Sequence, residues 1–344
     1  MERQVVAGIA KEKSRISVII ACRNEEENIE ACISSLSRIQ YPSESFEVIF
    51  VDDHSTDDTP ERIKSGISTF SNFSLIAAGT EGQGKKQALQ AGIANAKHEC
   101  IVTTDADCTV PTDWLSYFSL FFEDQKTQMV LGGVRIADNH SLFGRLQRME
   151  FSSLIGFAAS ALGWGRAVLG NAANMGFRKN AFREVNGYEG NLHVASGDDE
   201  FLIRKIARRF PGGIVFMNFS ESWITTKPME RVTDFFNQRL RWAGKWKYST
   251  DLLTRLIAVF ILLVQLAFVF GLTQTFQRPG ISTAVVGTKI IIEALYFFLI
   301  YRFQRTAFDL IAFFLLQIIY PLYGIVIGLR SLTGSYRWKD RNYK

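Results

Sequence analysis

Cysteine is scarce in this chain of 344 residues, and it follows no recognisable pattern. The four cysteines show no CxxC pair and no spacing typical of zinc ligands, which favours reduced, packed thiols in a cytosol-facing domain over disulfides or a zinc site. The first fifteen residues are polar and lack an apolar core, so we expect neither a signal peptide nor a leading membrane span. A nucleic-acid-binding motif is also missing, and we expect no nucleic-acid partner.

Charge is missing from long stretches of the C-terminal part of the chain. Aliphatic and aromatic residues make up 47% of the sequence, and their excess lies after about residue 250. Residues 256–276 and 310–329 carry no charge, and each run is long enough to cross a bilayer. A further run, residues 284–300, holds the i,i+4 pair Lys289 and Glu293, which predicts either a functional pair or a snorkelling lysine. We therefore predict a multi-pass membrane protein with about three C-terminal helices.

Basic residues flank this apolar region on both sides. The net charge is +5; residues 227–255 carry seven basic and three acidic side chains, and residues 330–344 carry five and one. Such flanks point to membrane phosphates, and by the positive-inside rule they favour the cytosolic side. Three crossings from a cytosolic start would instead leave the C-terminal end outside. One apolar stretch is therefore a candidate for a re-entrant or interfacial segment, and Pro321 predicts a kink in the last of them.

The N-terminal part alternates strand and helix signals. Residues 16–21 and 46–51 are continuous apolar runs of the kind found in strands covered on both faces, and residues 101–104 are β-branched and uncharged. After the first run, Asn24 is a candidate N-cap of a helix reaching about Arg38. This alternation predicts an α/β fold with a mostly parallel sheet.

Acidic side chains follow the predicted strands at residues 46–51 and 101–104. Asp105 and Asp107, two residues apart in an extended segment, face the same side with the small Ala106 between them. In an open α/β sheet, ligands bind beyond the carboxyl ends of the strands, so these acids point into a crevice. Two hard oxygen donors suit Mg²⁺ or Mn²⁺ holding a diphosphate, and a solvated turn is the alternative.

Charged residues also mark two predicted helix starts. Lys85 and Lys86 stand at the positive end of a helix over residues 85–95, where an anion such as a phosphate would account for them; a solvated lysine pair is the alternative. The acids of residues 198–200 begin a helix reaching about Arg209. They either complement its dipole or supply a general base for an acceptor hydroxyl.

Two further segments are candidates for substrate contact. Residues 170–178 (GNAANMGFR) predict a tight, backbone-lined loop leading to a strand, and its small residues allow a ligand close to the main chain. Residues 231–248 read as an amphipathic helix with aromatic and basic side chains three or four apart, which suits a membrane interface. This helix contains the sequence QRLRW.

Taken together, residues 16–246 resemble the family 2 glycosyltransferases, an inverting family with the GT-A fold. The segments that carry the resemblance are RNE at 23–25, VDDHSTD at 51–57, GK at 84–85, DAD at 105–107, GDD at 197–199 and QRLRW at 238–242. The last of them is similar to the QxxRW motif of the membrane-integrated cellulose, hyaluronan and poly-N-acetylglucosamine synthases and of ceramide glucosyltransferases.

The resemblance implies a role for each matching residue. Asp105 and Asp107 match the metal-binding DxD, with Asp107 as the direct ligand of Mg²⁺ or Mn²⁺, and Asp199 matches the catalytic base. Residues implied in acceptor binding are Asp198, Asn174 and Trp242. Residues implied in binding the nucleotide-sugar are Ala21, Arg23, Glu25, Asp53, Lys85, Asp105, Asp107, Gln238 and Arg241.

These observations predict an inverting, metal-dependent glycosyltransferase that uses a UDP-sugar at the cytosolic face of the cell membrane. The acceptor is a lipid, a lipid-linked molecule or a glycan; processive polysaccharide synthesis is the alternative. A sugar nucleotidyltransferase is the less favoured option, because a loop resembling GxGTRxxP is absent. We expect a GT-A domain over residues 1–230, an interface helix over 231–250, about three membrane helices over 251–330 and a basic tail over 331–344.

Overall fold

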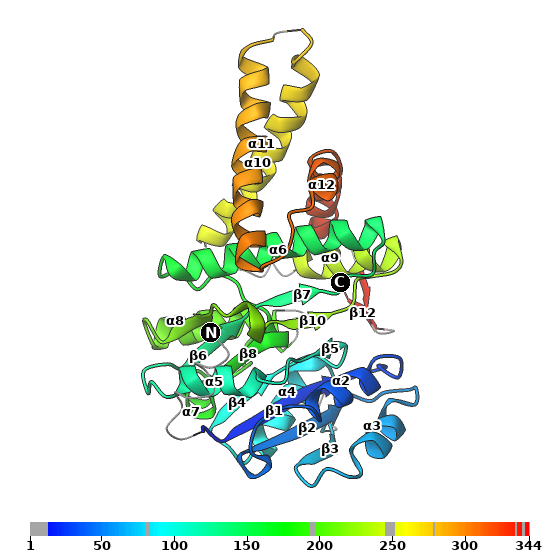
Figure 1. Ribbon diagram of the computed structural model, residues 1–344, viewed down its shortest axis with the longest axis vertical. Coiled ribbons are helices and arrows are strands. Elements are labelled where there is room, and N and C mark those ends of the chain that lie inside the picture. Colours follow the sequence, from blue (N-terminus) through cyan, green and yellow to red (C-terminus); the bar gives the residue numbers. More distant parts are fainter. Residues whose placement is uncertain are drawn as a thin grey trace. The chain divides into compact units, whose positions relative to one another are not determined.

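Seven strands form one mixed, mostly parallel sheet in the computed structural model (Figure 1). The structure describes residues 13–79, 83–192, 197–244, 252–277, 279–333, 336–338 and 341–343. The strands of the sheet are β1 (Ile16–Cys22), β2 (Phe46–Asp52), β3 (Phe73–Ala77), β4 (Cys100–Thr103), β6 (Met129–Gly132), β8 (Met175–Arg178) and β9 (Ile214–Met217). Their order is β3-β2-β1-β4-β8-β6-β9, and only β8 runs antiparallel to its neighbours. The predicted α/β architecture is confirmed.

The chain divides into two units. The first comprises Met1–Arg135 and Phe157–Lys227 and contains the large sheet; the second comprises Ile136–Gly156 and Pro228–Lys344 and contains the apolar helices. A small sheet is formed by β5 (Cys108–Thr109), β10 (Ile224–Thr226) and β7 (Val134–Ile136).

Helices cover the large sheet because its strands are apolar on both faces. The helices of this unit are α2 (Ile29–Leu36), α3 (Thr59–Ile67), α4 (Lys85–Asn95), α5 (Trp114–Phe122), α7 (Lys179–Glu184) and α8 (Asp198–Arg209). Ile19 of β1 packs in one core cluster with residues of α4 and α8. Gly92 lets α4 approach closely, since a Cβ there would stand 2.4 Å from Ile19 Cγ2. The aliphatic pattern of the strands thus fixes where the helices dock.

The start of α2 differs from the expectation. Asn24 does not cap this helix, which begins at Ile29 after a turn, with Asn28 at the N-cap position. Instead, Asn24 has a positive φ of 50°, and its Oδ1 accepts a hydrogen bond from the backbone N–H of Thr56 at 2.9 Å. The Asn24 side chain thus binds the loop after β2 and is not available to cap α2.

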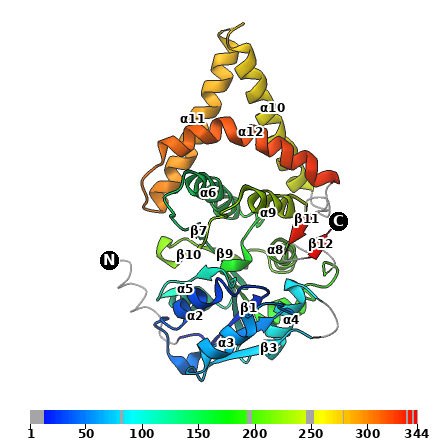
Figure 2. The same cartoon turned by 90° about the vertical axis from the view of Figure 1, so that its right-hand side faces the viewer.

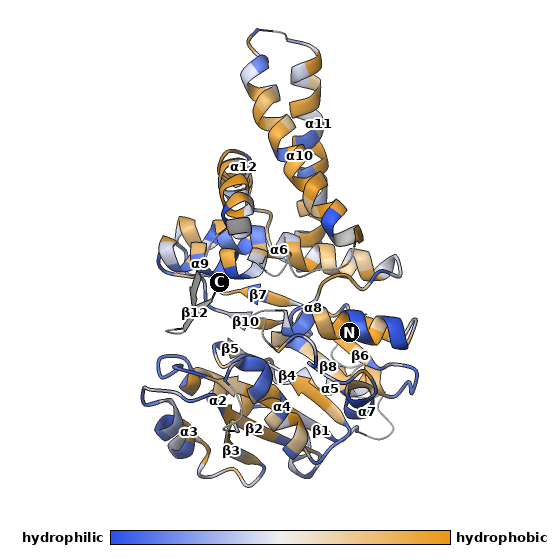
Figure 3. Cartoon of the chain, turned by 180° about the vertical axis from the view of Figure 1, so that it is seen from behind, coloured by the Kyte–Doolittle hydropathy of each residue, from blue (hydrophilic) through white to orange (hydrophobic). Residues whose placement is uncertain are grey.

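The second unit is helical. Its long helices are α6 (Leu142–Gly163, whose last turns belong to the first unit), α9 (Val232–Gly244), α10 (Leu252–Gln274), α11 (Ile281–Phe303) and α12 (Leu310–Thr333), followed by the strands β11 (Tyr336–Trp338) and β12 (Arg341–Tyr343). Arg255–Gln274, Ile281–Phe303 and Leu310–Ser331 are long and apolar enough to cross a membrane. Their apolar composition is visible as the mostly orange ribbons of α10, α11 and α12 in Figure 3. The prediction of three C-terminal apolar helices is confirmed.

Candidate functional site

The carboxyl ends of β1 and β2 are joined by a network around Arg23. The strands are parallel, with Cys22 in register with Asp52, so the residues that follow them emerge at one edge of the sheet. The Arg23 Nη1 donates to the carbonyl oxygens of Asp53 at 2.7 Å and His54 at 2.6 Å. The backbone N–H of Gly84 donates to Asp53 Oδ1 at 2.9 Å, which joins this edge to the start of α4. Two predicted nucleotide contacts therefore lie together.

Two other predicted nucleotide contacts have local structural roles. Ala21 is a residue of β1 and pairs with Val51 of β2. The backbone N–H of Glu25 donates to Thr59 Oγ1 at 2.7 Å, and the Glu25 carboxylate accepts from Asn28 Nδ2 at 2.9 Å. They border the same edge, and their contact with a nucleotide stays a prediction.

Lys85 joins two acids that are far apart in the sequence. Its Nζ lies 2.6 Å from Asp105 Oδ1 at the end of β4 and 3.1 Å from Asp198 Oδ2 at the start of α8. The Lys85 side chain is 20% exposed, so a ligand from solvent can reach it. Residues from three predicted segments therefore converge on one ammonium group.

The charges of this cluster perturb one another strongly. Burial lowers the pKa of Lys85, but attraction to Asp105 and Asp198 outweighs burial and raises it well above its usual range. Burial raises the pKa of Asp105, and Asp107 adds to this effect while Lys85 opposes it. Burial also acts to raise the pKa of Asp198, yet Lys85 and Lys86 overcome it and leave this pKa lowered. The cluster therefore favours a charged lysine between two acids whose pKa values are shifted in opposite directions.

Asp105 and Asp107 provide the oxygen donors expected for a divalent cation. Among the residues that the structure describes, no group of three or more His, Cys, Asp or Glu side chains is arranged to hold a metal ion. The two carboxylates of the DAD turn fit a cation whose remaining ligands come from a diphosphate, because Mg²⁺ is commonly held by one or two carboxylates plus phosphates. Asp107 Oδ1 accepts a weak hydrogen bond from the Cys108 thiol at 3.4 Å.

The acids at the start of α8 are not equivalent. Asp198 is buried and contacts Lys85, whereas Asp199 is half-buried, and its Oδ1 accepts from the backbone N–H of Glu200 at 2.6 Å. Gly197 supports this turn with a φ of 80°. Sequence reasoning missed Tyr188, a buried residue of the same neighbourhood; burial raises the pKa of its phenol, and Asp198 raises it further.

Asn174 is a structural residue at the start of β8. Its side chain has no exposed surface; Nδ2 donates to Gly133 O at 2.7 Å, and Oδ1 accepts from Trp114 Nε1 at 2.9 Å. A Cβ at Gly132 would stand only 2.4 Å from Asn174, which shows how closely the amide is packed. Contact with an acceptor would require these bonds to break, so the expected acceptor role of Asn174 gains no support here.

The QRLRW segment lies on α9 in the second unit. Gln238 Oε1 accepts from Arg239 Nη1, and the Arg239 guanidinium stacks 4.4 Å from the Trp242 ring centroid. Trp242 also contacts Phe151 of α6, with ring centroids 5.9 Å apart. Arg241 and Trp242 follow Arg239 within one turn of the same helix. Their contacts with the diphosphate and the acceptor stay predictions.

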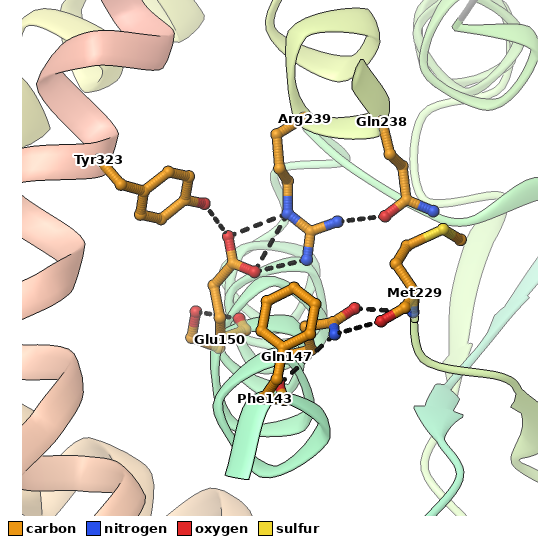
Figure 4. Close-up of polar contacts among 8 residues, drawn as sticks. Phe143, Gln147, Glu150, Met229, Gln238, Arg239 and Tyr323 are labelled. Atoms are coloured by element: carbon orange, nitrogen blue, oxygen red, sulfur yellow. Dashed lines mark hydrogen bonds and ion pairs between the residues drawn. The ribbon is translucent and has the colours of Figure 1, made fainter. Parts of the chain in front are cut away.

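Arg239 is the residue of this segment that sequence reasoning left without a role. Its guanidinium forms a buried ion pair with Glu150 of α6, with Nε 3.1 Å from both carboxylate oxygens (Figure 4). Tyr323 of α12 donates to the same carboxylate, so three helices meet at Glu150. A lone glutamate among the apolar residues of 142–163 was the available signal, because a buried charge requires a partner.

Residues 17–186, about half of the chain, match the family model described as Glycosyl transferase family 2. The mixed, mostly parallel sheet with acids beyond its strand ends is that of a GT-A type protein, and the chain belongs to glycosyl transferase family 2.

Two bacterial synthases and one solved mannosyltransferase structure are similar to this chain. The chain is 35% identical over 143 residues to a poly-beta-1,6-N-acetyl-D-glucosamine synthase of Staphylococcus aureus, covering 41% of this chain and 34% of that protein. It is 26% identical over 231 residues to the synthase of the same name from Staphylococcus epidermidis, covering 66% and 53%. The chain thus spans about a third to a half of the length of these relatives. A mannosyltransferase from Pyrobaculum calidifontis, solved in complex with GDP-Man and Mn²⁺, has the same fold, with a TM-score of 0.58, 17% identity and coverage of 94% and 88%.

Proposed function

We propose that this protein is an inverting glycosyltransferase that moves a sugar from a UDP-sugar to a lipid, lipid-linked or glycan acceptor at the cytosolic face of the cell membrane. The observation that carries the proposal is the cluster of Lys85, Asp105 and Asp198 at the carboxyl ends of the parallel strands. In this proposal Lys85 leaves its carboxylate partners to bind the diphosphate and returns to them afterwards, which suits a site that binds and releases a nucleotide. In this proposal residues 1–230 are catalytic, 231–250 line the interface, 251–330 enter the membrane and 331–344 form the basic tail.

The donor would be held by residues of the sheet edge and of α9. Asp53 and Arg23 would position the nucleoside, and Lys85 with Arg241 would neutralise the diphosphate. Asp107, assisted by Asp105, would hold Mg²⁺ or Mn²⁺, which when bound stabilises the negative charge of the departing diphosphate. The Mn²⁺ in the mannosyltransferase of the same fold agrees with this cofactor class.

The acceptor side would be built from the start of α8 and the motif helix. Asp199 would take the proton from the acceptor hydroxyl, so that this oxygen attacks the anomeric carbon directly as the diphosphate leaves, with inversion. Asp198 would hold the Lys85 side chain in place beside the proposed base, Asp199. Trp242 would offer an aromatic face to the acceptor.

Processive polysaccharide synthesis is the second candidate, because both curated relatives described above are named as synthases of a β-1,6-linked polysaccharide. The two candidates share donor and base and differ in the number of transfers per acceptor. The length distribution of the product on a lipid or oligosaccharide primer separates them.

A donor screen tests the proposal. The full chain, purified in detergent, is incubated with radiolabelled UDP- and GDP-sugars, membrane lipid extract and Mg²⁺ or Mn²⁺. We expect UDP release and label transfer with one UDP-sugar. The Asp107→Asn variant should lose the metal-dependent release, while Asp58→Asn, a change of an exposed aspartate, should keep it. Unchanged turnover in Asp107→Asn would show that the metal assignment is wrong.

A further inference from the structure

The helices α10 and α11 form a hairpin whose tip projects beyond the other helices of the second unit (Figure 2), while α11 contacts α12 through Lys289, Glu293 and Gln317. Exposed apolar residues lie around most of α10, including Leu256, Phe260 and Phe270. A helix of 23 residues is about 34 Å long at 1.5 Å per residue, enough to cross the hydrocarbon core. The hairpin therefore has the length and the surface of two membrane crossings.

The helix α12 has a different environment, although its hydropathy is similar. Most of its exposed apolar residues form one stripe with spacings of three and four, and its other face is buried, with Phe313 and Leu316 among the buried residues. The residues of the stripe are Ile311, Phe314, Ile318, Leu322, Val326 and Leu329, and the exposed Leu310 and Ile319 are next to members of it in the sequence. Only one side of α12 is thus open to lipid.

Polar contacts keep α12 near α6. Asp309, just before α12, pairs with Arg145 of α6 through two bonds of 2.6 Å. Fourteen residues later (323 minus 309), Tyr323 donates to Glu150 of α6. Fourteen helical residues span about 21 Å. The two residues of α6 that are contacted, Arg145 and Glu150, are nevertheless only five residues apart, so α12 has not moved away from α6 over this length. Both ends of this stretch of α12 therefore lie beside α6, while Gln317 between them bonds Lys289 and Glu293 of α11.

The helix α9, unlike α10 and α11, does not have the properties of a membrane-crossing helix. It has 13 residues, about 20 Å, and carries Asp234, Arg239 and Arg241, so it is too short and too charged to cross a bilayer. Figure 2 shows α12 as an arch with both ends near the base of the α10–α11 hairpin, and Pro321 lies inside this helix. Proline removes a backbone hydrogen bond and bends helices, which accounts for the arch.

We propose that α10 and α11 are the two helices that cross the bilayer and that α12 is re-entrant, dipping into one leaflet with its apolar stripe toward lipid. The segment before α10 and the segment after α12 then lie on the same side. This arrangement satisfies the positive-inside rule for both basic flanks, which three crossings cannot do. The strand β11 lies against α9, in agreement with this sidedness. This membrane topology does not depend on the proposed reaction.

Single introduced cysteines test the sidedness in the full chain. The sites are Val232→Cys on α9, Phe276→Cys at the tip of the hairpin and Asn342→Cys on β12, with Thr306→Cys between α11 and α12 as the control. A membrane-impermeant maleimide is applied to intact cells and to inverted membrane vesicles. The four native cysteines are buried, and burial raises the pKa of their thiols, so they give little background.

We expect Val232→Cys, Thr306→Cys and Asn342→Cys to be labelled in the same preparation, and Phe276→Cys only in the other. Labelling of Asn342→Cys from the side opposite to Val232→Cys would overturn the proposal in favour of three crossings. Labelling of Phe276→Cys together with Val232→Cys would overturn the hairpin crossing. If a cysteine variant fails to accumulate, a fluorescent protein or a phosphatase fused after Lys344 of the unaltered chain reports the same side: a fluorescent, phosphatase-negative result supports the proposal and the reverse refutes it.

Discussion

Removing one partner of the Glu150–Arg239 ion pair should destabilise the protein far more than removing an exposed pair. The side chains of Arg239 and Glu150 are buried, at 5% and 7% exposure respectively, so Arg239→Met leaves an uncompensated carboxylate among three helices. Breaking a buried pair in this way costs about 3–5 kcal/mol. The matched control is Arg62→Met, which removes an exposed pair with Glu30 (43% and 71% exposed) and should cost about 0–1 kcal/mol.

The double variant Glu150→Met/Arg239→Met separates charge burial from packing. Both charges are then gone, and the remaining cost is that of the Tyr323 hydroxyl and the Gln238 amide, at most about 1–3 kcal/mol for each of these half-buried groups. The double variant should therefore lose less stability than the sum of the two single variants. The measurement is the free energy of unfolding from a denaturant titration in detergent micelles, followed by circular dichroism. Equal losses in Arg239→Met and Arg62→Met, or strict additivity in the double variant, would refute the reasoning.

Three further predictions concern the site and the fold. Asp199→Asn should keep nucleotide affinity while losing transfer, because the base contacts the acceptor; calorimetry showing lost UDP affinity would contradict that role. Trp242→Ala should reduce acceptor use more than donor hydrolysis, since the ring is assigned to the acceptor; equal losses in both assays would remove the assignment. The native thiols should resist alkylation at pH 8 until the protein is unfolded, and mass spectrometry showing rapid modification of the folded chain would place them at the surface. The buried cysteines concerned are Cys22, Cys32, Cys100 and Cys108.

Local patterns were sufficient for the elements and for part of the site. The apolar run of β1, the helix Lys85–Asn95 and the three C-terminal apolar helices follow from the periodicity and composition of neighbouring residues. Because parallel strands end at one edge, the same patterns also predicted that the residues after β1, β2 and β4 would lie together.

Other features depend on which distant side chains meet after folding. Lys85 pairs with Asp198, so the acids at the start of α8 are not equivalent. Arg239 pairs with Glu150, which is 89 residues away in the sequence. The path of α12 is likewise decided by its contacts, because its hydropathy alone lies within the range of α10 and α11. The sequence by itself determined the strands, the helices, the family and the acids available for catalysis, since these follow from short-range periodicity and motif. Only the tertiary structure decided how charges are paired and which apolar helix turns back, because burial and ion pairing depend on neighbours that the chain brings together from far apart.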